Sequence, residues 1–153
     1  MSVINSFDLS GKTALVTGCK RGIGRGMAEA LAQAGADIVG VSASLELSGS
    51  DVENAVKALG RDFRAYQCDF GDRKALTEFA AQLESDGVKP DILINNAGMQ
   101  HRTELQDFPA DAFERLLQTN IASVFHVGQA VARCLHGPAS FAVGRVPQVQ
   151  HRQ

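Results

Sequence analysis

The sequence predicts an α/β fold in which a parallel sheet is covered by helices on both faces, the doubly wound arrangement. Short apolar runs alternate along the chain with segments whose apolar residues recur at helical spacing. The runs carry few polar positions, as strands covered on both faces do, and glycine or proline stands at several of the boundaries. Together these observations predict the order β-α-β-α-β-α-β-α.

The first half of this order contains two strands and two helices. Lys12–Thr17 is expected to be a buried strand, followed by a helix over Gly22–Ala34 that ends at Gly35. The second strand is expected over Asp37–Val41 and the second helix over Ser50–Leu59. The apolar residues at helical spacing in these two helices are Ile23, Met27, Ala30, Leu31 and Ala34, then Val52, Val56 and Leu59.

The second half of the order ends in a long helix. The third strand is expected over Asp62–Gln67 and the third helix over Asp72–Glu84. Pro90 then interrupts the chain before a fourth strand over Asp91–Ile94, and a helical stretch runs from about Pro109 to Leu135. The residues expected to be buried in these helices are Leu76, Phe79, Ala80 and Leu83, then Phe113, Leu116, Leu117, Ile121, Val124 and Phe125.

Length and composition fit one globular domain and exclude several other classes. The 153 residues suffice for a sizeable core, and 44% hydrophobic residues is ordinary for such a domain. A net charge of -2 without a large basic block argues against nucleic acid and anionic membranes as partners. We expect no signal peptide or transmembrane span, hence a cytoplasmic location. The cysteines and histidines lack zinc-like spacing, so we expect no metal site.

A glycine-rich turn joins the first strand to the first helix. Glycines let a backbone approach a pyrophosphate, and the helix that follows presents free N–H groups and its positive dipole end to the phosphates. No Lys-Ser or Lys-Thr pair follows, so the turn is not a Walker loop. The alternative is a glycine-rich helix start without a ligand. The residues expected at the cofactor in this turn are Thr17, Gly18, Lys20, Arg21, Gly22, Ile23 and Gly24.

Between a first strand and a first helix, this turn predicts a Rossmann-like dinucleotide-binding domain. We expect it to occupy residues 1–135 as the N-terminal half of such a fold, with about four strands in the order 3-2-1-4. Residues 136–153 contain two prolines and two glycines and show no clear period. They are therefore expected to be irregular rather than a further strand and helix.

Four motifs together resemble the short-chain dehydrogenase/reductase family over roughly Leu9–Leu135. The first is the spacing Thr-Gly-x-x-x-Gly-x-Gly in the turn. Within the family, the likeness is to sugar-acid dehydrogenases, with 2-deoxy-D-gluconate 3-dehydrogenases first and gluconate 5-dehydrogenases second. The other motifs are Asp69-Phe70 after the third strand, Asn95-Asn96-Ala97-Gly98 after the fourth, and Asn120 in the long helix.

The resemblance implies a role for each motif, beside a structural alternative. Asp69 accepts a hydrogen bond from the adenine amino group, or else caps the following helix. Asn95 and Asn96 hold the cofactor ribose and fix the exit of the fourth strand, or else form a simple turn that favours positive φ. Asn120 is the catalytic residue that kinks the long helix and holds a water in the proton relay, or else lies at the edge of the apolar stripe. Further cofactor contacts are expected from Phe70, Ala97 and Gly98.

The resemblance implies an oxidoreductase that transfers hydride between NAD(P) and a sugar acid or similar alcohol or ketone. NAD enzymes carry an acid after the second strand, and NADP enzymes carry a base there. Here Ser42 is expected at the cofactor, and Glu46 lies beyond the usual position of the acid. Lys20 and Arg21 could attract a 2′-phosphate. NAD is the expected cofactor because the sugar-acid relatives use it, and NADP is the alternative.

The family's proton donor is missing from this sequence. The family chemistry uses a tyrosine with a lysine four residues later, and a serine that positions the substrate. The only tyrosine, Tyr66, lies in the expected third strand and is followed four residues later by Phe70. We therefore expect the chain alone not to turn over substrate. A non-catalytic dinucleotide-binding module and a non-functional fragment are the alternatives.

Three further expectations concern the periphery. Val149–Gln153 can be encoded by DNA that, read one nucleotide later, gives Phe-Asn-Ile-Ala-Ser, which resembles the end of the family's fifth strand; the tail is therefore interpreted as a frameshift product. In the family the long helix also builds a subunit interface, so a homo-oligomer is expected through it. His101 and Arg102 face a substrate carboxylate or are solvated loop residues.

Overall fold

The computed structural model describes residues 7–136, so the tail predicted to be irregular lies outside the described residues apart from His136. The strands are β1 (Thr13–Thr17), β2 (Asp37–Ser42), β3 (Phe63–Gln67) and β4 (Ile92–Ile94). The helices are α1 (Gly22–Gln33), α2 (Asp51–Ala58), α3 (Arg73–Ser85), α4 (Ala110–Leu117) and α5 (Ser123–His136). Two shorter helical segments are the 3-10 turn η2 (Leu105–Asp107) and the π-helical segment η3 (Gln118–Ala122).

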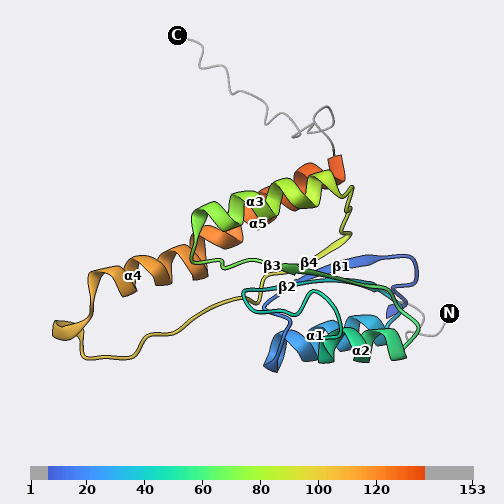
Figure 1. The fold of residues 1–153 in the computed structure, drawn as a ribbon, viewed down its shortest axis with the longest axis horizontal. Helices are drawn as coiled ribbons and strands as arrows, with labels where there is room; N and C mark the ends of the chain where they lie inside the picture. Colours follow the sequence, from blue (N-terminus) through green and yellow to red (C-terminus); the bar gives the residue numbers. More distant parts are fainter. Residues whose placement is uncertain (1–6, 137–153) are drawn as a thin grey trace, which may run out of the picture.

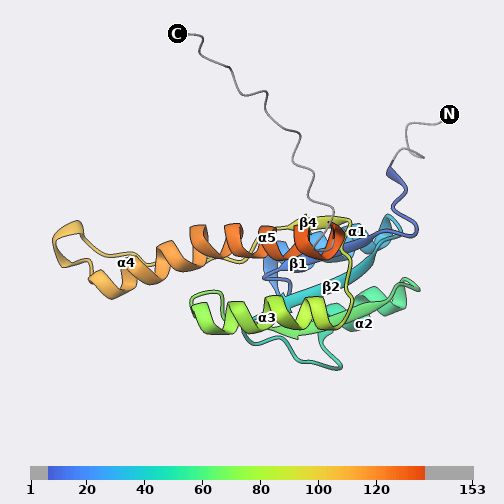
Figure 2. The same cartoon turned by 90° about the horizontal axis from the view of Figure 1, so that it is seen from above.

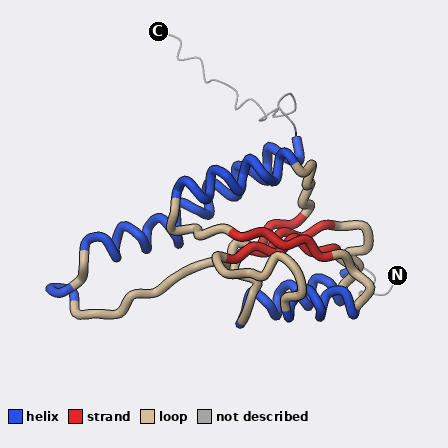
Figure 3. The backbone as a smooth tube through the Cα atoms, viewed as in Figure 1, coloured by secondary structure: helices blue, strands red, loops and turns tan. Residues whose placement is uncertain are grey.

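The four strands form one parallel sheet in the order β3-β2-β1-β4, which confirms the predicted fold class and strand order. The register places Leu15 of β1 between Val39 of β2 and Leu93 of β4. In Figure 1 the sheet is seen nearly edge-on, with α1 and α2 on one side and α3 and α5 on the other. Figure 3 shows the same three layers by secondary structure.

Each face of the sheet has its own hydrophobic core because successive strand residues point to opposite sides. Toward α1 and α2, Val16 and Ile38 pack with Val52 of α2. Toward α3 and α5, Leu15 packs with Phe79 of α3 among other buried residues. Figure 2 shows α3 and α5 side by side above the sheet. The central strands β1 and β2 are buried on both faces and their middle residues are apolar, whereas the edge strand β3 carries the exposed polar residues Arg64 and Gln67.

The starts of α2 and α3 are fixed by side-chain caps. Ser50 Oγ accepts a hydrogen bond from Glu53 N (3.2 Å) and begins α2. Asp72 Oδ1 accepts a hydrogen bond from Lys74 N (2.8 Å) and begins α3. Such caps satisfy N–H groups that have no partner within the helix. Asp72, and not Asp69, is therefore the cap of the helix after β3, and the cap alternative for Asp69 is wrong.

The predicted apolar face of α1 is correct at Leu31, which packs against the core, and wrong at Ile23 and Met27. The residues of α1 that are buried are Gly24, Ala28 and Ala32, whereas Ile23 is 74% exposed and Met27 is also exposed. At the start of the helix a larger side chain would not fit, because a Cβ on Gly24 would overlap Gly18 O of the turn after β1. The same error occurs at the end of the next helix, where Leu59 is exposed while Val52 and Val56 of α2 are buried.

The long helix is not continuous, and its predicted buried stripe is mostly exposed. The π-helical segment η3 interrupts it, and such a segment shifts the phase of the residues on either side. In Figure 1, α4 extends beyond the edge of the layered body, so its apolar residues have no sheet to cover. Leu116 is half-buried, and the buried residues are Thr119, Ser123, Val127, Ala130 and Val131. The exposed apolar residues, termed the α4–α5 stripe, are Phe113, Leu117, Ile121, Val124 and Phe125.

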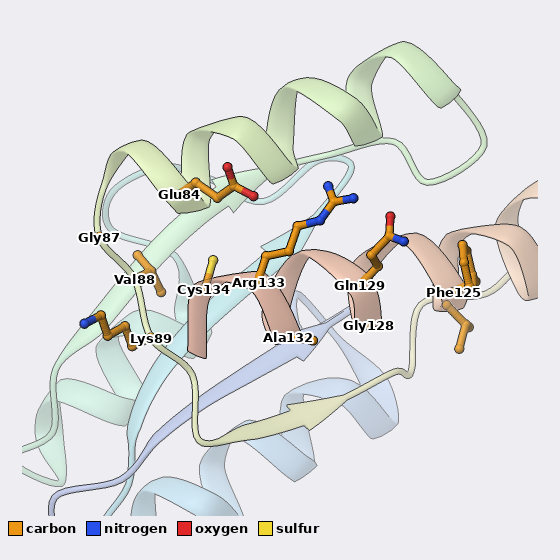
Figure 4. A pocket seen from close by; sticks show the side chains of 11 residues that line it. Glu84, Gly87, Val88, Lys89, Phe125, Gly128, Gln129, Ala132, Arg133 and Cys134 are labelled. Atoms are coloured by element: carbon orange, nitrogen blue, oxygen red, sulfur yellow. The ribbon is translucent and has the colours of Figure 1, made fainter. Parts of the chain in front are cut away.

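A wide cavity of about 1080 Å³ lies between α5 and the end of α3. Figure 4 shows Glu84 from α3, Val88 and Lys89 from the turn before β4, and Arg133 and Cys134 from α5 around it. Within the described residues, β4 pairs with β1 alone, so this edge of the sheet is open. The glycine-rich turn between β1 and α1 does not line the cavity.

Among the helices of the described residues, none combines the length and the apolar character needed to cross a membrane. Within the same residues, no three His, Cys, Asp or Glu side chains are grouped so as to hold a metal ion.

Candidate dinucleotide-binding site

The turn between β1 and α1 requires glycine at specific positions. Gly18 and Gly22 have φ of 69° and 59°, in the left-handed region that favours glycine. A Cβ on Gly24 would lie 2.2 Å from Gly18 O and 2.4 Å from Asn96 Nδ2, so only glycine fits there. The turn thus packs tightly against both the first turn of α1 and the segment after β4.

The N-terminus of α1 is open to a ligand. Arg21 precedes the helix and makes no side-chain cap, and the first turn of α1 contains no acidic residue. The first N–H groups of a helix have no partner within the helix, and the macrodipole makes this end attractive to anions. The geometry of the turn and of α1 therefore suits a pyrophosphate.

Hydrogen bonds of Thr17 and Asn96 tie the end of β1 to the end of β4. Thr17 Oγ1 accepts hydrogen bonds from Asn96 N and Ala97 N (2.9 Å each) and donates one to Ile94 O (3.2 Å). Asn96 Nδ2 donates to Thr17 O (3.1 Å) and Gly18 O (3.3 Å). These contacts fix the exit of β4, whereas no residue of this segment has a positive φ, so the simple positive-φ turn is wrong.

A cleft of about 510 Å³ opens at the carboxyl ends of β1, β2, β3 and β4. The strand order reverses between β1 and β4, and ligands of open parallel sheets bind at such a switch point. The cleft is lined by Gly18, Lys20, Arg21, Gly22, Ser42, Ala43, Ser44, Asp69, Phe70, Asn96, Ala97, Gly98, Met99, Arg115 and Thr119. Of the predicted residues, Thr17, Ile23, Gly24, Asn95 and Asn120 do not line the cleft.

Asp69 is held at the cleft by two partners. Its Oδ2 lies 2.7 Å from Arg115 Nη2, and its Oδ1 accepts a hydrogen bond from Gly71 N (2.9 Å). Partial burial acts to raise the pKa of Asp69, but the Gly71 N–H and the Arg115 guanidinium outweigh it and lower the pKa below its ordinary value. Asp69 is therefore an ionised hydrogen-bond acceptor with a fixed orientation. The ring of Phe70 beside it is buried and packs edge-on against Phe79.

Sequence reasoning missed Arg115, which lies 46 positions from its partner Asp69. Nothing in the sequence distinguishes Arg115 from any other exposed basic residue on a helix. Its place at the cleft is seen only in the folded structure. A Cβ on Gly71 would lie 2.9 Å from Arg115 Cζ, which shows how closely α4 approaches the turn after β3. Thr119 was missed for the same reason. Ala43, Ser44 and Met99 also line the cleft, and they directly follow the predicted residues Ser42 and Gly98.

Asn120 lies in η3 and is bound to the backbone after Gly98. Its Oδ1 accepts a hydrogen bond from Met99 N (2.9 Å), and its Nδ2 donates to Met99 O (3.0 Å). The predicted kink coincides with the π-helical segment. Asn120 thus positions the segment that follows β4, while its part in a proton relay stays a prediction.

Lys20 is tied to the residues that follow β2. Its backbone N donates to Ser42 Oγ (3.1 Å), and its Nζ donates to Ser44 O (2.5 Å) and Glu46 Oε1 (2.7 Å). The hydrogen bond from Lys20 lowers the pKa of Glu46 below its ordinary value. Arg21, next to Lys20, is exposed.

Three residues considered for substrate binding or catalysis lie elsewhere. His101 packs against Phe108 and Arg102 donates to Gln100 Oε1 (3.1 Å), and neither lines the cleft. Tyr66 is 8% exposed on the α3 side of the sheet, where its hydroxyl donates to Asp86 Oδ2 (2.6 Å). Burial raises the pKa of Tyr66, so this phenol is not prepared for proton transfer.

The family model for short chain dehydrogenases matches residues 12–146 of the chain. The chain belongs to this family. The match includes the glycine-rich turn, the segment after β4 and Asn120, which are the features around the cleft of this short-chain dehydrogenase.

Two curated relatives and one solved structure illustrate the likeness of this short-chain dehydrogenase. It is 52% identical over 131 residues to 2-dehydro-3-deoxy-D-gluconate 5-dehydrogenase of Pseudoalteromonas atlantica, covering 86% of this chain and 52% of the relative. It is 41% identical over 133 residues to gluconate 5-dehydrogenase of Gluconobacter oxydans, covering 87% and 52%. It matches the structure of 3-oxoacyl (acyl-carrier-protein) reductase from Agrobacterium tumefaciens with NADP bound, with 30% identity, a TM-score of 0.79 and coverage of 88% and 52%.

The first two relatives confirm the predicted likeness to sugar-acid dehydrogenases, and the third confirms the Rossmann-like fold. This short-chain dehydrogenase spans about half the length of the curated relatives it matches.

Proposed function

We propose that this chain binds a nicotinamide dinucleotide in the cleft at the carboxyl ends of the strands. The observation that carries the proposal is the turn Gly18–Gly24, where a Cβ on Gly24 would overlap Gly18 O and the open end of α1 faces the cleft. The cleft volume of about 510 Å³ lies within the range of small-molecule sites. The turn, the anion-attracting helix end and the polar lining all suit the same ligand.

Each part of the dinucleotide has residues suited to hold it. The N–H groups at the start of α1, with the backbone of Gly22, would bind the pyrophosphate. The ionised Asp69 would accept a hydrogen bond from the adenine amino group, with Arg115 fixing its orientation. Ala97 and Gly98 line the cleft in the segment held by Asn96, and they would contact the ribose beside the nicotinamide. Asn95 lies next to this segment and does not line the cleft. When bound, the nicotinamide supplies hydride transfer, which side chains alone cannot supply.

The proposed activity of the family protein is hydride transfer between NAD(P) and a sugar acid or a similar alcohol or ketone. The sugar-acid assignment is supported by the 52% identity to the 2-dehydro-3-deoxy-D-gluconate 5-dehydrogenase of Pseudoalteromonas atlantica. NAD(P) use is supported by the turn and by the reductase of Agrobacterium tumefaciens, whose structure contains NADP. His101 and Arg102 lie outside the cleft, so this structure adds no support for their binding a substrate carboxylate.

For residues 1–153 alone, we propose binding without turnover. The single tyrosine has no lysine four residues later, and its hydroxyl is bound to Asp86 on the far side of the sheet from α1. General acid–base catalysis contributes about 10²–10⁴-fold in typical enzymes, and the lysine and the aspartate that line the cleft, Lys20 and Asp69, are both held in ion pairs. The tight turn favours a non-catalytic dinucleotide-binding module over a non-functional fragment.

Calorimetry and a spectroscopic assay on one preparation of the 153-residue chain distinguish an active dehydrogenase, a non-catalytic binding module and a non-functional fragment. We expect saturable binding of NAD or NADP, and no absorbance change at the reduced nicotinamide band when gluconate or a deoxygluconate is added. A full-length relative assayed beside it shows that the assay detects turnover. Sugar-acid oxidation above background would contradict the proposed inactivity, and a folded chain that binds neither dinucleotide would contradict the binding itself.

We also propose that the α4–α5 stripe mediates self-association. Its five apolar residues are exposed along α4, η3 and the start of α5, and Phe125 is 64% exposed. Exposed apolar stripes of this kind mark interaction surfaces more often than they stay in water.

A further inference from the structure

The helix α4 presents different residues to the cleft and to the α4–α5 stripe. Arg115 and Thr119 lie four positions apart, so they share one side of the helix, and both line the cleft. Phe113 and Leu117 share another side in the same way, and both are exposed members of the stripe. Phe113 and Arg115 are turned about 160° from each other around the helix axis. The helix α4 therefore connects the proposed dinucleotide site to the proposed self-association surface.

Few contacts hold α4 against the rest of the chain. It has eight residues, and none of them is buried. A helix of this length is not stable in water by its own hydrogen bonds, so its conformation depends on contacts with other parts of the molecule. Among the described residues of α4, Arg115 alone forms a side-chain hydrogen bond to a residue outside the helix, with Nη2 2.7 Å from Asp69 Oδ2. In Figure 2, α4 projects beyond the end of the sheet.

The contact with Arg115 orients Asp69 and leaves room on it for a ligand. An ionised carboxylate has about four lone-pair sites, and Arg115 and Gly71 N each use one of them. The close approach of α4 depends on the missing side chain of Gly71, where a Cβ would lie 2.9 Å from Arg115 Cζ and 3.1 Å from Thr119 Oγ1. When α4 lies against the cleft, the carboxylate proposed to bind the adenine amino group is therefore fixed without being filled.

We infer that Arg115 couples the two sites, so that self-association through the α4–α5 stripe raises the affinity of the chain for a nicotinamide dinucleotide. The inference rests on both the proposed dinucleotide binding and the proposed self-association. A second copy that packs on Phe113 and Leu117 stabilises α4 as a helix and so holds Arg115 beside Asp69. A dinucleotide bound to Asp69 stabilises the same arrangement from the cleft. Because both favour one conformation, each raises the affinity of the chain for the other.

The segments η3 and α5 are held by the rest of the chain without a second copy. Asn120 is bound to both backbone groups of Met99, and Ser123 and Val127 are buried. The part of the stripe in η3 and α5 therefore gains little order from self-association. The part in α4 is the one that a second copy stabilises most, and Arg115 transmits this effect to the cleft.

Titrations of NAD at several concentrations of the 153-residue chain test the inference without any enzyme activity. Sedimentation gives the fraction of associated chain with and without NAD. Calorimetry gives the dissociation constant for NAD at protein concentrations below and above the midpoint of association. Leu117→Gln weakens the stripe, and Arg115→Met removes the ion pair with Asp69. Circular dichroism and thermal melting show whether each variant is folded.

Each variant has a matched control outside α4. Leu59→Gln is the control for Leu117→Gln, because Leu59 at the end of α2 is 44% exposed and Leu117 is 41% exposed. Arg61→Met is the control for Arg115→Met, because Arg61 is paired with Asp37 (3.8 Å) at the start of β2, and neither residue of this pair lines the cleft.

The unchanged chain is expected to bind NAD about fivefold more tightly when associated than when dissociated. NAD is expected to strengthen self-association by the same factor for each NAD bound, since coupling of two binding events is reciprocal. Leu117→Gln is expected to stay dissociated and to keep the weaker affinity for NAD. Arg115→Met is expected to associate and to show the weaker affinity at every protein concentration. Leu59→Gln and Arg61→Met are expected to behave as the unchanged chain.

An affinity for NAD that does not change on self-association overturns the inference and leaves both proposals intact. A folded Arg115→Met variant whose affinity still rises on association overturns the part given to Arg115. A folded chain that stays monomeric at every concentration overturns the inference and the proposed self-association, while dinucleotide binding stands. A folded chain that binds neither NAD nor NADP overturns the inference and the proposed binding together.

Discussion

Replacing Gly24 by alanine is expected to abolish dinucleotide binding and to lower the free energy of unfolding by about 1–3 kcal/mol. The new Cβ would lie 2.2 Å from Gly18 O and 2.4 Å from Asn96 Nδ2. Neither atom can move freely, because Asn96 is hydrogen bonded to the backbone of Thr17 and Gly18. The turn must therefore shift, and with it the N–H groups that would bind the pyrophosphate. Calorimetry with NAD and urea unfolding measure the two effects.

Gly26→Ala in the same helix is the matched control for Gly24→Ala. A Cβ on Gly26 meets no atom within 4 Å, and Gly26 lies inside α1. Alanine is the better helix former by about 1 kcal/mol, so Gly26→Ala is expected to stabilise the chain and to keep its affinity for NAD. If Gly24→Ala binds NAD as well as Gly26→Ala does, the turn is not the cofactor cradle described above.

Replacing Thr17 by valine is expected to lower the free energy of unfolding by about 2–4 kcal/mol, because each buried donor left unpaired costs about 1–3 kcal/mol. The Thr17 hydroxyl accepts from both Asn96 N and Ala97 N, and it is almost fully buried. Valine keeps the shape and the strand propensity of threonine, so the loss isolates the hydrogen bonds. Affinity for NAD is also expected to fall, since the segment after β4 would lose its link to the turn.

Thr13→Val is the matched control for Thr17→Val, because Thr13 stands in the same strand at its half-buried start. Its effect on urea unfolding is expected to stay within about 0.5 kcal/mol. Equal losses for the two variants would mean that the effect belongs to β1 as a strand, and would contradict the role given to the Thr17 hydroxyl.

The strands β1 and β2 could be predicted from the sequence because they are buried on both faces. In β1 the residues Ala14, Leu15 and Val16 are all apolar and buried, which is the pattern of a covered strand. The glycine-rich turn that follows marks the end of this strand in the sequence. Which face of each helix is buried was harder to predict from the sequence. In α1 the buried residues are Gly24, Ala28 and Ala32, and a pattern based on large apolar residues selects a neighbouring face on which Ile23 and Met27 are exposed.

Some of the residues around the cleft could also be predicted from the sequence, and others could not. Backbone-determined features, such as Gly18 and Gly22, could be predicted because their residue type is dictated by φ. The pairs Lys20–Glu46 and Asp69–Arg115 could not, because each joins residues 26 or more positions apart through exposed side chains of ordinary type. The exposed α4–α5 stripe was mispredicted since the π-helical segment changes the phase within one apparent helix.

Chemical-shift perturbation by NAD tests the central claim, the location of the cofactor cleft, most directly. In a ¹H–¹⁵N spectrum of the 153-residue chain, NAD is expected to shift the amides of the turn Gly18–Gly24, of Asp69 and of Ala97–Gly98. The amides of Gln129 and Arg133, at the larger cavity between α3 and α5, are expected to stay in place. Shifts confined to that larger cavity, or none in a folded chain, would contradict the account.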